Sequence, residues 1–241
     1  MDAFDPDDAA RAVSQALREV GTPERAAQEK RYLKSELEFF GVTVPVLRRV
    51  VAGAVRGYPG LDGAGMVAWA VALWSEPVHE RRMAAVEILT LAAPKLGSAE
   101  LATVERLVRE SGTWALVDGL AVNVAGEIAL RDPQSWPVID RWAADADFWV
   151  RRSALLALVC GIRAGRPELA RFTRYAEPML AEREFFIRKA LGWVLREISK
   201  FDPDWVAAWT ERYLPQLSGV TFREAVRRLP PAEAERLRAM R

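Results

Sequence analysis

The sequence is poor in the residue types from which metal sites and thiol or histidine catalysis are usually built. Among 241 residues there is one cysteine, Cys160, and one histidine, His79. A single cysteine excludes a disulfide within the chain, and its surroundings, ALLALVCGI, are typical of a small core residue. A single histidine excludes histidine-dependent triads and leaves almost no ligands for zinc or iron. We therefore expect no cofactor and no metal, and chemistry that rests on carboxylates, arginines and aromatic side chains.

Long hydrophobic runs are also missing. No segment approaches the roughly 20 apolar residues of a membrane span, and the start, MDAFDPDDAA, is acidic where a signal peptide would be basic and then apolar. The hydrophobic fraction, 51%, is nevertheless sufficient for a large core. The sequence predicts a cytoplasmic protein without membrane attachment, and we expect a monomer with one continuous domain over residues 1–241.

The hydrophobic spacing is helical along nearly the whole chain. Val13, Leu17 and Val20 repeat at intervals of three to four residues, and no segment shows convincing strand alternation. Proline and glycine interrupt the pattern at fairly regular distances, as at Thr22-Pro23 and Asp202-Pro203, where new helices are expected to begin. The pattern predicts an all-α protein, an α-α superhelix of about a dozen helices of roughly 12–18 residues stacked in pairs.

Charge is unevenly distributed, although the formal net charge is only +1. Residues 1–30 contain four basic and seven acidic side chains, whereas residues 148–228 contain 15 Lys and Arg against nine Asp and Glu. Basic pairs recur near three expected helix starts, at Arg81-Arg82, Arg151-Arg152 and Arg188-Lys189. Stacked repeats would align these pairs on one concave face that tracks DNA phosphates. The alternative is that they are ordinary solvated helix surface.

One acidic residue stands out among the tryptophan-rich helices. Asp118 interrupts the apolar segment WALVDGLAVNVAG, and Trp114 precedes it by four residues, so both side chains project from the same helical face. Asp118 is either a structural carboxylate, which caps a helix or pairs with an arginine, or a carboxylate beside an aromatic wall that faces a developing positive charge. Four other tryptophans lie in apolar segments and are expected in the core: Trp69, Trp74, Trp136 and Trp142.

The sequence resembles the AlkD-type alkylpurine DNA glycosylases, which are built from HEAT-like helical repeats. The segments that carry the resemblance are YLKSELEFFGVTVPVLRRV (residues 32–50), LWSEPVHERRMAAVEIL, TWALVD, FWVRRSALLAL and above all EFFIRKALGWVLREISKFDPDWV (residues 184–206). The resemblance covers most of the chain. Departures from the family pattern occur at Val44, Ala115, Leu116 and residues 219–221.

The resemblance implies roles for individual residues. It places the catalytic carboxylate at Asp118, with Trp114 and Trp193 as aromatic walls that hold the sugar and attract the cationic nucleotide. It assigns Arg152 to the DNA face near the lesion. The further residues predicted to bind DNA are Arg151, Arg188, Lys189, Tyr32, Lys34, Arg48 and Arg223.

The implied function is hydrolysis of the N-glycosidic bond of N3- or N7-alkylated purines in double-stranded DNA, in base excision repair. Such a base is already cationic and leaves as a neutral molecule, so little general acid is needed, which fits a chain with one histidine. The resemblance also implies capture of the lesion without a base-flipping pocket, which would tolerate bulky adducts.

Two other functions are compatible with the sequence. One is a DNA-binding scaffold without catalysis, against which the presence of Asp118 with both tryptophans counts. The other is a helical-repeat protein-interaction module, which the near-neutral net charge favours.

Overall fold

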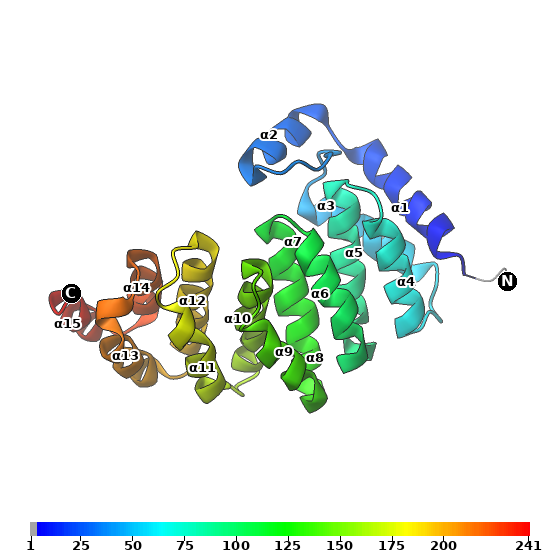
Figure 1. Cartoon of the computed structure of the whole chain (residues 1–241). Helices are drawn as coiled ribbons and strands as arrows, with labels where there is room; N and C mark the ends of the chain where they lie inside the picture. Colours follow the sequence, from blue (N-terminus) through cyan, green and yellow to red (C-terminus); the bar gives the residue numbers. More distant parts are fainter. Residues whose placement is uncertain (1–3) are drawn as a thin grey trace. The chain divides into compact units, whose positions relative to one another are not determined.

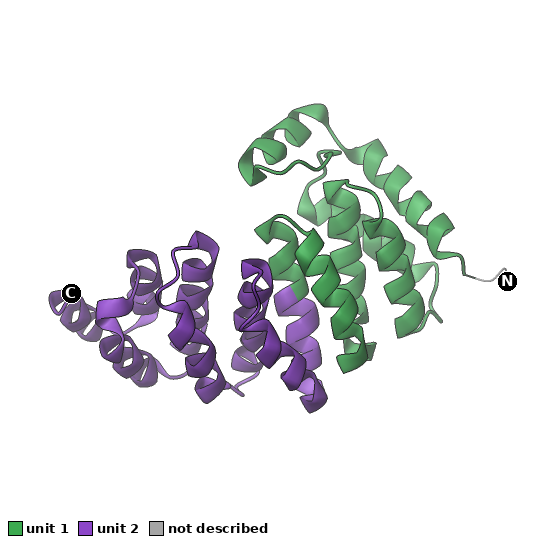
Figure 2. Cartoon of the chain, viewed as in Figure 1, with its two compact units in different colours: residues 1–120 green, residues 121–241 purple. Residues whose placement is uncertain are grey.

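The computed structural model describes residues 4–241, and its ribbon is helical almost throughout (Figure 1). Within these residues there is no strand, and the β pairing is confined to an isolated bridge between Glu38 and Val78. The all-α fold predicted from the helical spacing is confirmed. The chain divides into two compact units, the first ending at Leu120 and the second spanning Ala121–Arg241 (Figure 2). The single continuous domain stays a prediction, and the units are described separately.

The first unit is built from helices that pack against one another. In it α4 packs against α1 and α5, and α5 also packs against α3 and α7. Its core is apolar, with Leu17, Leu47 and Trp69 fully buried. The helices are α1 (Pro6–Val20), α2 (Pro23–Leu33), α3 (Val44–Arg56), α4 (Gly63–Trp74), α5 (His79–Ala92), α6 (Leu101–Glu110) and α7 (Trp114–Gly119), with 3₁₀ turns at Ala93–Lys95 and Ser98–Glu100.

The second unit continues with helices of the same kind. Helix α12 lies between α10 and α14 and packs against both, and α10 packs against α8 and α9 (Figure 1). The helices are α8 (Gly126–Arg131), α9 (Trp136–Trp142), α10 (Phe148–Arg163), α11 (Leu169–Met179), α12 (Phe185–Ile198), α13 (Pro203–Arg212), α14 (Gly219–Ala225) and α15 (Pro231–Ala239), with 3₁₀ turns at Pro133–Ser135, Leu214–Gln216 and Val226–Arg228.

Helix starts fall where the sequence predicts them. Helix α2 begins at Pro23, after Thr22, whose hydroxyl accepts a hydrogen bond from the Arg25 N–H. Helix α13 begins at Pro203, after Asp202, whose carboxylate accepts from the Trp205 N–H at 2.9 Å. Proline costs nothing at these positions because the first N–H groups of a helix have no intrahelical partner.

The expected helix length of 12–18 residues is wrong for several helices. Helix α10 has 16 residues, but α7 and α8 have six each. These two are parts of one unbroken helical run that changes hydrogen-bond register through a π-helix at Leu120–Ala125. The division between the units falls inside this π-helix. Hydrophobic spacing could not predict the interruption, because a change of register leaves the sequence pattern helical.

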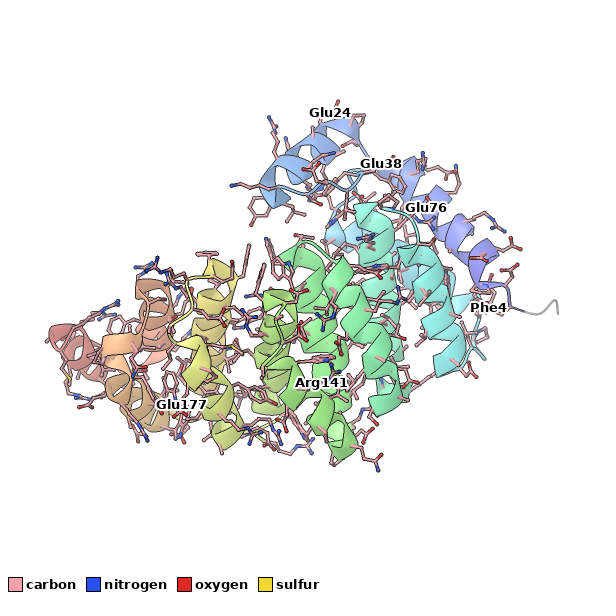
Figure 3. All side chains as sticks on the ribbon, in the orientation of Figure 1. Phe4, Glu24, Glu38, Glu76, Arg141 and Glu177 are labelled. Atoms are coloured by element: carbon pink, nitrogen blue, oxygen red, sulfur yellow. The ribbon has the colours of Figure 1, made fainter. Side chains whose placement is uncertain are left out.

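The segment between α2 and α3 is fixed by a buried carboxylate. Glu80, at the start of α5, is 1% exposed. Its oxygens accept hydrogen bonds from the backbone N–H groups of Phe40 at 2.9 Å, Gly41 at 2.6 Å and Val42 at 3.0 Å. The segment also contains Glu38, labelled in Figure 3, whose carbonyl accepts from the His79 N–H at 2.8 Å. The segment is thus held by contacts with α5.

Helix α2 depends on this segment, because none of its residues is fully buried. The N–H of Thr22, before α2, donates to the Gly41 carbonyl at 3.2 Å. Gly41 has a φ of 81°, and a Cβ at this position would lie 2.0 Å from the Thr22 carbonyl oxygen. Only glycine permits this approach, so Gly41 joins the two ends of the α2 segment.

The tryptophans expected in the core divide into two groups. Trp69, Trp74 and Trp142 are buried, as predicted. Trp136 is half-buried instead, and the Arg171 guanidinium lies 4.2 Å from its ring centre. The core assignment of Trp136 is therefore wrong. Helical spacing places this ring on the inner side of α9, but it does not show that a pocket opens beside it.

Candidate functional site

Helix α7 carries the predicted catalytic pair of the first unit. Trp114 and Asp118 are both half-buried, one helical turn apart. The next residue, Gly119, lets α7 approach α5 closely, since a Cβ there would lie 2.6 Å from Cγ1 of Val86. The π-helix follows directly, and such interruptions are frequent at functional sites. The structure therefore places Asp118 on a short, closely packed helix next to an irregular segment.

Tyr32 is brought to this helix from α2. Its side chain is 72% exposed, and its ring meets Trp114 edge to face, with ring centres 6.1 Å apart and planes at 87°. The structure thus joins a predicted DNA contact to a predicted catalytic aromatic residue. Lys34, another predicted contact, follows α2 in a left-handed conformation with a φ of 49° and is exposed. Arg48 is exposed as well and forms an ion pair with Glu87 at 2.8 Å.

The sole histidine is a buried part of the fold. The ring of His79 stacks on Phe39 at 4.6 Å between ring centres. Burial lowers the pKa of His79 to about 4, an effect that the negative charge of Glu80 opposes. His79 is therefore neutral near pH 7.

In the second unit, the first predicted DNA contact is part of an internal ion pair. Arg151 donates from Nε and Nη2 to the two oxygens of Glu182, at 2.9 and 2.7 Å. Its Nη1 donates to the carbonyls of Asp145 and Ala146. Arg188 donates to the main-chain carbonyl of the same Glu182 at 2.7 Å. Arg151 and Arg188 thus share Glu182 as a partner and hold the loop before α12, while their place on a DNA-binding face stays a prediction.

Arg152 is almost completely buried. It is 3% exposed, donates from Nη1 to the Phe186 carbonyl, and lies with its guanidinium 5.9 Å from the Phe186 ring centre. This arrangement ties the start of α12 to α10. Direct contact between Arg152 and a DNA phosphate requires the side chain to leave these partners, so that contact stays a prediction.

The remaining predicted residues of α12 also have partners within the unit. Lys189 donates to Glu224 at 2.9 Å, and Arg196 forms an ion pair with the same carboxylate. Burial raises the pKa of Glu224, but the hydrogen bond from Lys189 and the nearby positive charges lower it further, so the net shift is downward. Trp193 is half-buried, and its Nε1 donates to Glu197 at 3.3 Å. The basic face predicted on α12 is thus balanced by carboxylates.

The starts of α10 and α12 carry an aromatic cluster, which the sequence analysis does not predict. Trp149 lies 4.4 Å from Phe148 and 4.8 Å from Phe186 between ring centres, and Phe185 meets Phe186 edge to face at 5.5 Å. Phe185 is exposed, and the other three rings are half-buried. In the sequence, aromatic residues precede the basic pairs Arg151-Arg152 and Arg188-Lys189, but this spacing alone does not show that the two aromatic pairs meet.

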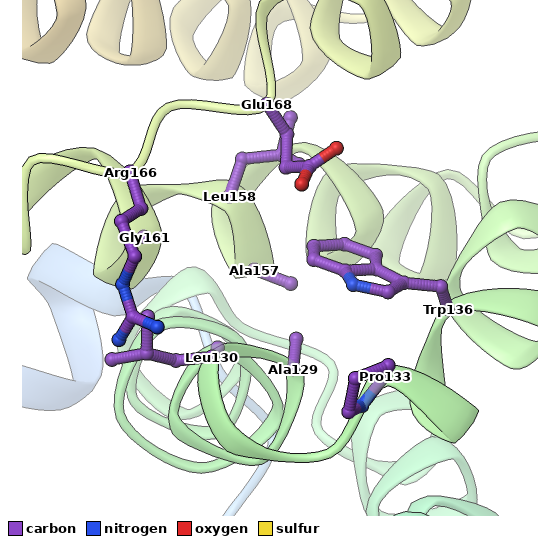
Figure 4. Close-up of a pocket in the computed structure, with 10 residues that line it drawn as sticks. Ala129, Leu130, Pro133, Trp136, Ala157, Leu158, Gly161, Arg166 and Glu168 are labelled. Carbon is purple, nitrogen blue, oxygen red and sulfur yellow. The ribbon is translucent and has the colours of Figure 1, made fainter.

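A pocket opens in the second unit beside Trp136 (Figure 4). Its walls are mostly small and apolar side chains, with the charged groups of Arg166 and Glu168 on the loop after α10. It contains none of the predicted site residues. The lining residues are Gly126, Ala129, Leu130, Pro133, Trp136, Ala157, Leu158, Gly161, Arg166 and Glu168.

Arg223 is exposed and belongs to a second pocket, which we call the arginine pocket. It is formed by α14, the following 3₁₀ turn, and the end of the chain. The residues that line it are Phe222, Arg223, Val226, Arg227, Arg238 and Arg241.

Two further features bear on possible chemistry. Within residues 4–241, no group of three or more His, Cys, Asp and Glu side chains is arranged to hold a metal ion. Cys160 is half-buried on α10, and its pKa is raised to about 11 by burial and by a hydrogen bond to Glu127. Its thiol is therefore protonated at neutral pH.

Among the described helices, none combines the length and apolar character required to cross a membrane.

Comparison with known proteins identifies relatives of this fold. The family model described as DNA alkylation repair enzyme matches residues 13–229. A predicted DNA alkylation repair enzyme from Enterococcus faecalis is 22% identical with a TM-score of 0.78, over 88% of this chain and 97% of that one. AlkD2 from Streptococcus mutans is 19% identical with a TM-score of 0.59, over 90% of this chain and 99% of that one. No match is found among the curated proteins.

Proposed function

Because the chain belongs to the DNA alkylation repair enzyme family, we propose that it is a DNA glycosylase that removes cationic, N3- or N7-alkylated purines from double-stranded DNA. The substrate is an alkylpurine nucleotide within a duplex, and the products are the free base and an abasic site. Bulky adducts are included in the proposed range. We expect the protein to act in base excision repair, as a monomer in the cytoplasm.

The reaction needs few protein groups. The bond between C1′ of the deoxyribose and the purine nitrogen breaks, and its electron pair leaves with the base, which becomes neutral. Positive charge then develops on the sugar, and a pre-positioned carboxylate stabilises that charge. Water adds to C1′ and releases a proton. In this proposal Asp118 faces the developing charge and orients the water, while the indole face of Trp114 holds the nucleotide, at about 0.5–2 kcal/mol for a cation–π contact. The role of Trp193 as a further aromatic wall stays a prediction.

The observation that carries the proposal is the arrangement on α7. Asp118 and Trp114 lie one turn apart on a short helix pressed against α5 through Gly119, and the exposed ring of Tyr32 meets Trp114. The exposed ring of Tyr32 beside the half-buried Trp114 extends the aromatic surface next to Asp118. Such a surface suits a nucleotide site.

The decisive experiment compares base release by the wild type and Asp118→Asn. Duplex DNA that carries N7- or N3-alkylpurines is incubated with each protein, and free base and abasic sites are quantified. We expect release by the wild type and a loss of at least about 100-fold in the variant, the size typical of removing one preorganised electrostatic group. Asp204→Asn, on the exposed surface of α13, is the matched control because it removes the same charge.

The outcomes separate the candidate functions. Equal release by wild type and Asp118→Asn contradicts the role of Asp118. Salt-dependent DNA binding without release by either protein supports the DNA-binding scaffold, because phosphate contacts displace counterions. The absence of both release and salt-dependent binding supports the protein-interaction module.

A further inference from the structure

The arginine pocket is unusual because its charge is of one sign. Four of its six lining residues are arginines, and no acidic residue lines it. The arginines come from three different segments, namely α14, the 3₁₀ turn at Val226–Arg228, and the end of the chain from α15 to Arg241. Arg223 and Arg227 lie one helical turn apart, and Arg238 and Arg241 follow 11–18 residues later along the chain, so the meeting of the two pairs depends on the fold.

The arginines of this pocket have fewer acidic partners than several other basic side chains of the second unit. Arg151, Lys189 and Arg196 each form a close ion pair. Within residues 4–241, by contrast, no side-chain carboxylate pairs with Arg223, Arg238 or Arg241. Arg227 approaches Glu224 at 3.7 Å, with its own side chain 64% exposed. Four arginines with one side-chain carboxylate within ion-pair distance form an excess of like charge, which is destabilising, so the pocket favours an anionic ligand.

The guanidinium groups are held by specific contacts. Arg241 lies 4.7 Å above the ring centre of the buried Phe222, and its Nη2 donates to the Leu217 carbonyl at 3.3 Å. A Cβ built at Gly219 would lie 3.3 Å from Arg223 Nη1 and 3.7 Å from Arg241 Nη2. Two guanidinium groups from different segments therefore converge at Gly219, and one of them is already oriented.

The chemistry of the ligand follows from these groups. Planar guanidinium groups bind phosphate oxygens through paired N–H donors, and several of them around one site match the charge of a phosphate better than that of a carboxylate. All four arginines are exposed, so a phosphate that belongs to a longer backbone can enter. We propose that the arginine pocket binds one phosphate group of the DNA backbone. The choice of DNA as its source rests on the proposed function.

The first test is DNA binding by the double variant Arg223→Gln, Arg238→Gln, measured by fluorescence anisotropy on an undamaged duplex at several salt concentrations. We expect affinity about tenfold lower at low salt, which is about 1.4 kcal/mol, and a salt slope shallower by about 1. The control is Arg11→Gln, Arg106→Gln, which removes the same charge from two exposed arginines that have carboxylate partners. Equal weakening in both double variants would overturn the proposal, because it would reflect net charge alone.

The second test identifies the source of the phosphate. The side-chain N–H signals of the four arginines are followed by NMR during titration with inorganic phosphate and then with the duplex, and the signals lost in the double variant are those of Arg223 and Arg238. We expect inorganic phosphate to shift these signals and the duplex to displace it. Binding of inorganic phosphate that the duplex does not displace would overturn the assignment to DNA. The absence of any shift would overturn the anion site itself.

These tests are independent of base excision. Binding of an undamaged duplex through the pocket by a protein that releases no alkylated base would overturn the proposed glycosylase activity and leave the phosphate site standing. If the wild type excises the base and the double variant keeps wild-type affinity and salt slope, the phosphate site is overturned and the glycosylase activity stands. Because the substituted side chains are exposed in both double variants, we expect both proteins to fold, which thermal unfolding verifies.

Discussion

Tyr32 and Trp114 meet edge to face, with ring centres 6.1 Å apart, although they belong to α2 and α7. The contact joins a helix without fully buried residues to the helix that carries Asp118. Its geometry is the one that the opposite charges of ring edge and ring face favour. A segment near the start of the chain thus contributes to the surface beside the proposed catalytic carboxylate.

Replacing Tyr32 by alanine should slow base release while leaving the fold intact. Because the Tyr32 ring lies beside the proposed site, we expect a rate roughly 2–10-fold lower for Tyr32→Ala and a rate near wild type for Tyr32→Phe. Stability should fall by no more than about 0.5–1.5 kcal/mol, the contribution of one such ring pair. Single-turnover base release and urea unfolding measure the two effects. An equal loss in Tyr32→Phe would assign the role to the hydroxyl group instead.

Replacing Gly119 by alanine should displace α7. The added Cβ would meet Val86 Cγ1 at 2.6 Å, and overpacking of this kind costs about 1–3 kcal/mol. We expect Gly119→Ala to be less stable and slower in base release. The double variant Gly119→Ala, Val86→Ala should recover part of both, because the clashing methyl group is absent. Additive losses in this double-mutant cycle would contradict a direct contact between the two positions.

Stability should fall as the pH is lowered from about 6.5 to about 4, because His79 is buried. Its pKa in the folded chain is about 4, and its ordinary value is 6.5. Between these values the unfolded chain binds a proton that the folded chain does not, so acid favours unfolding. The loss attributable to His79 is about 3 kcal/mol, at about 1.4 kcal/mol for each pKa unit.

Urea unfolding across this pH range measures the effect, with His79→Gln as the neutral comparison. The decrease in stability should be smaller in His79→Gln than in the wild type. If both proteins lose stability equally with acid, groups other than His79 are responsible.

Arg151 should matter more for stability than an exposed arginine with a similar ion pair. Its side chain is 18% exposed and donates to both oxygens of Glu182 and to two main-chain carbonyls. We expect Arg151→Ala to lower the free energy of unfolding by about 2–3 kcal/mol. Arg106→Ala, which removes an exposed pair with Glu110, should cost less than about 1 kcal/mol. Similar losses in chemical denaturation would show that the carbonyl contacts of Arg151 contribute nothing.

The sequence predicts the helices well because helix starts are local. Thr22-Pro23 and Asp202-Pro203 begin helices through contacts within a few residues, and the structure has both. Partners far along the chain cannot be predicted in the same way. The pattern around Arg151-Arg152 predicts a basic surface, but it cannot show that Glu182 and the Phe186 carbonyl engage these side chains.

The same limit applies to the candidate site. The spacing of Trp114 and Asp118 follows from helical geometry, and their place on α7 agrees with it. The sequence predicts that Tyr32 binds DNA, but the contact of Tyr32 with Trp114 depends on the path of the chain between α2 and α3. That path is set by a buried carboxylate, Glu80, for which a single sequence gives no distinct signal.

The anchoring of Gly41 by Glu80 and Thr22 has a consequence for local unfolding. Since α2 buries no residue completely, few apolar contacts oppose its opening, and its amide hydrogens should exchange with solvent before those of α4 and α5. The backbone hydrogen bonds to Glu80 lie beyond the end of α2 and should remain protected. Residues 23–33 would then open and close as a small cooperative segment between fixed ends, and Tyr32 would leave and regain Trp114 in each cycle without unfolding of the remaining helices.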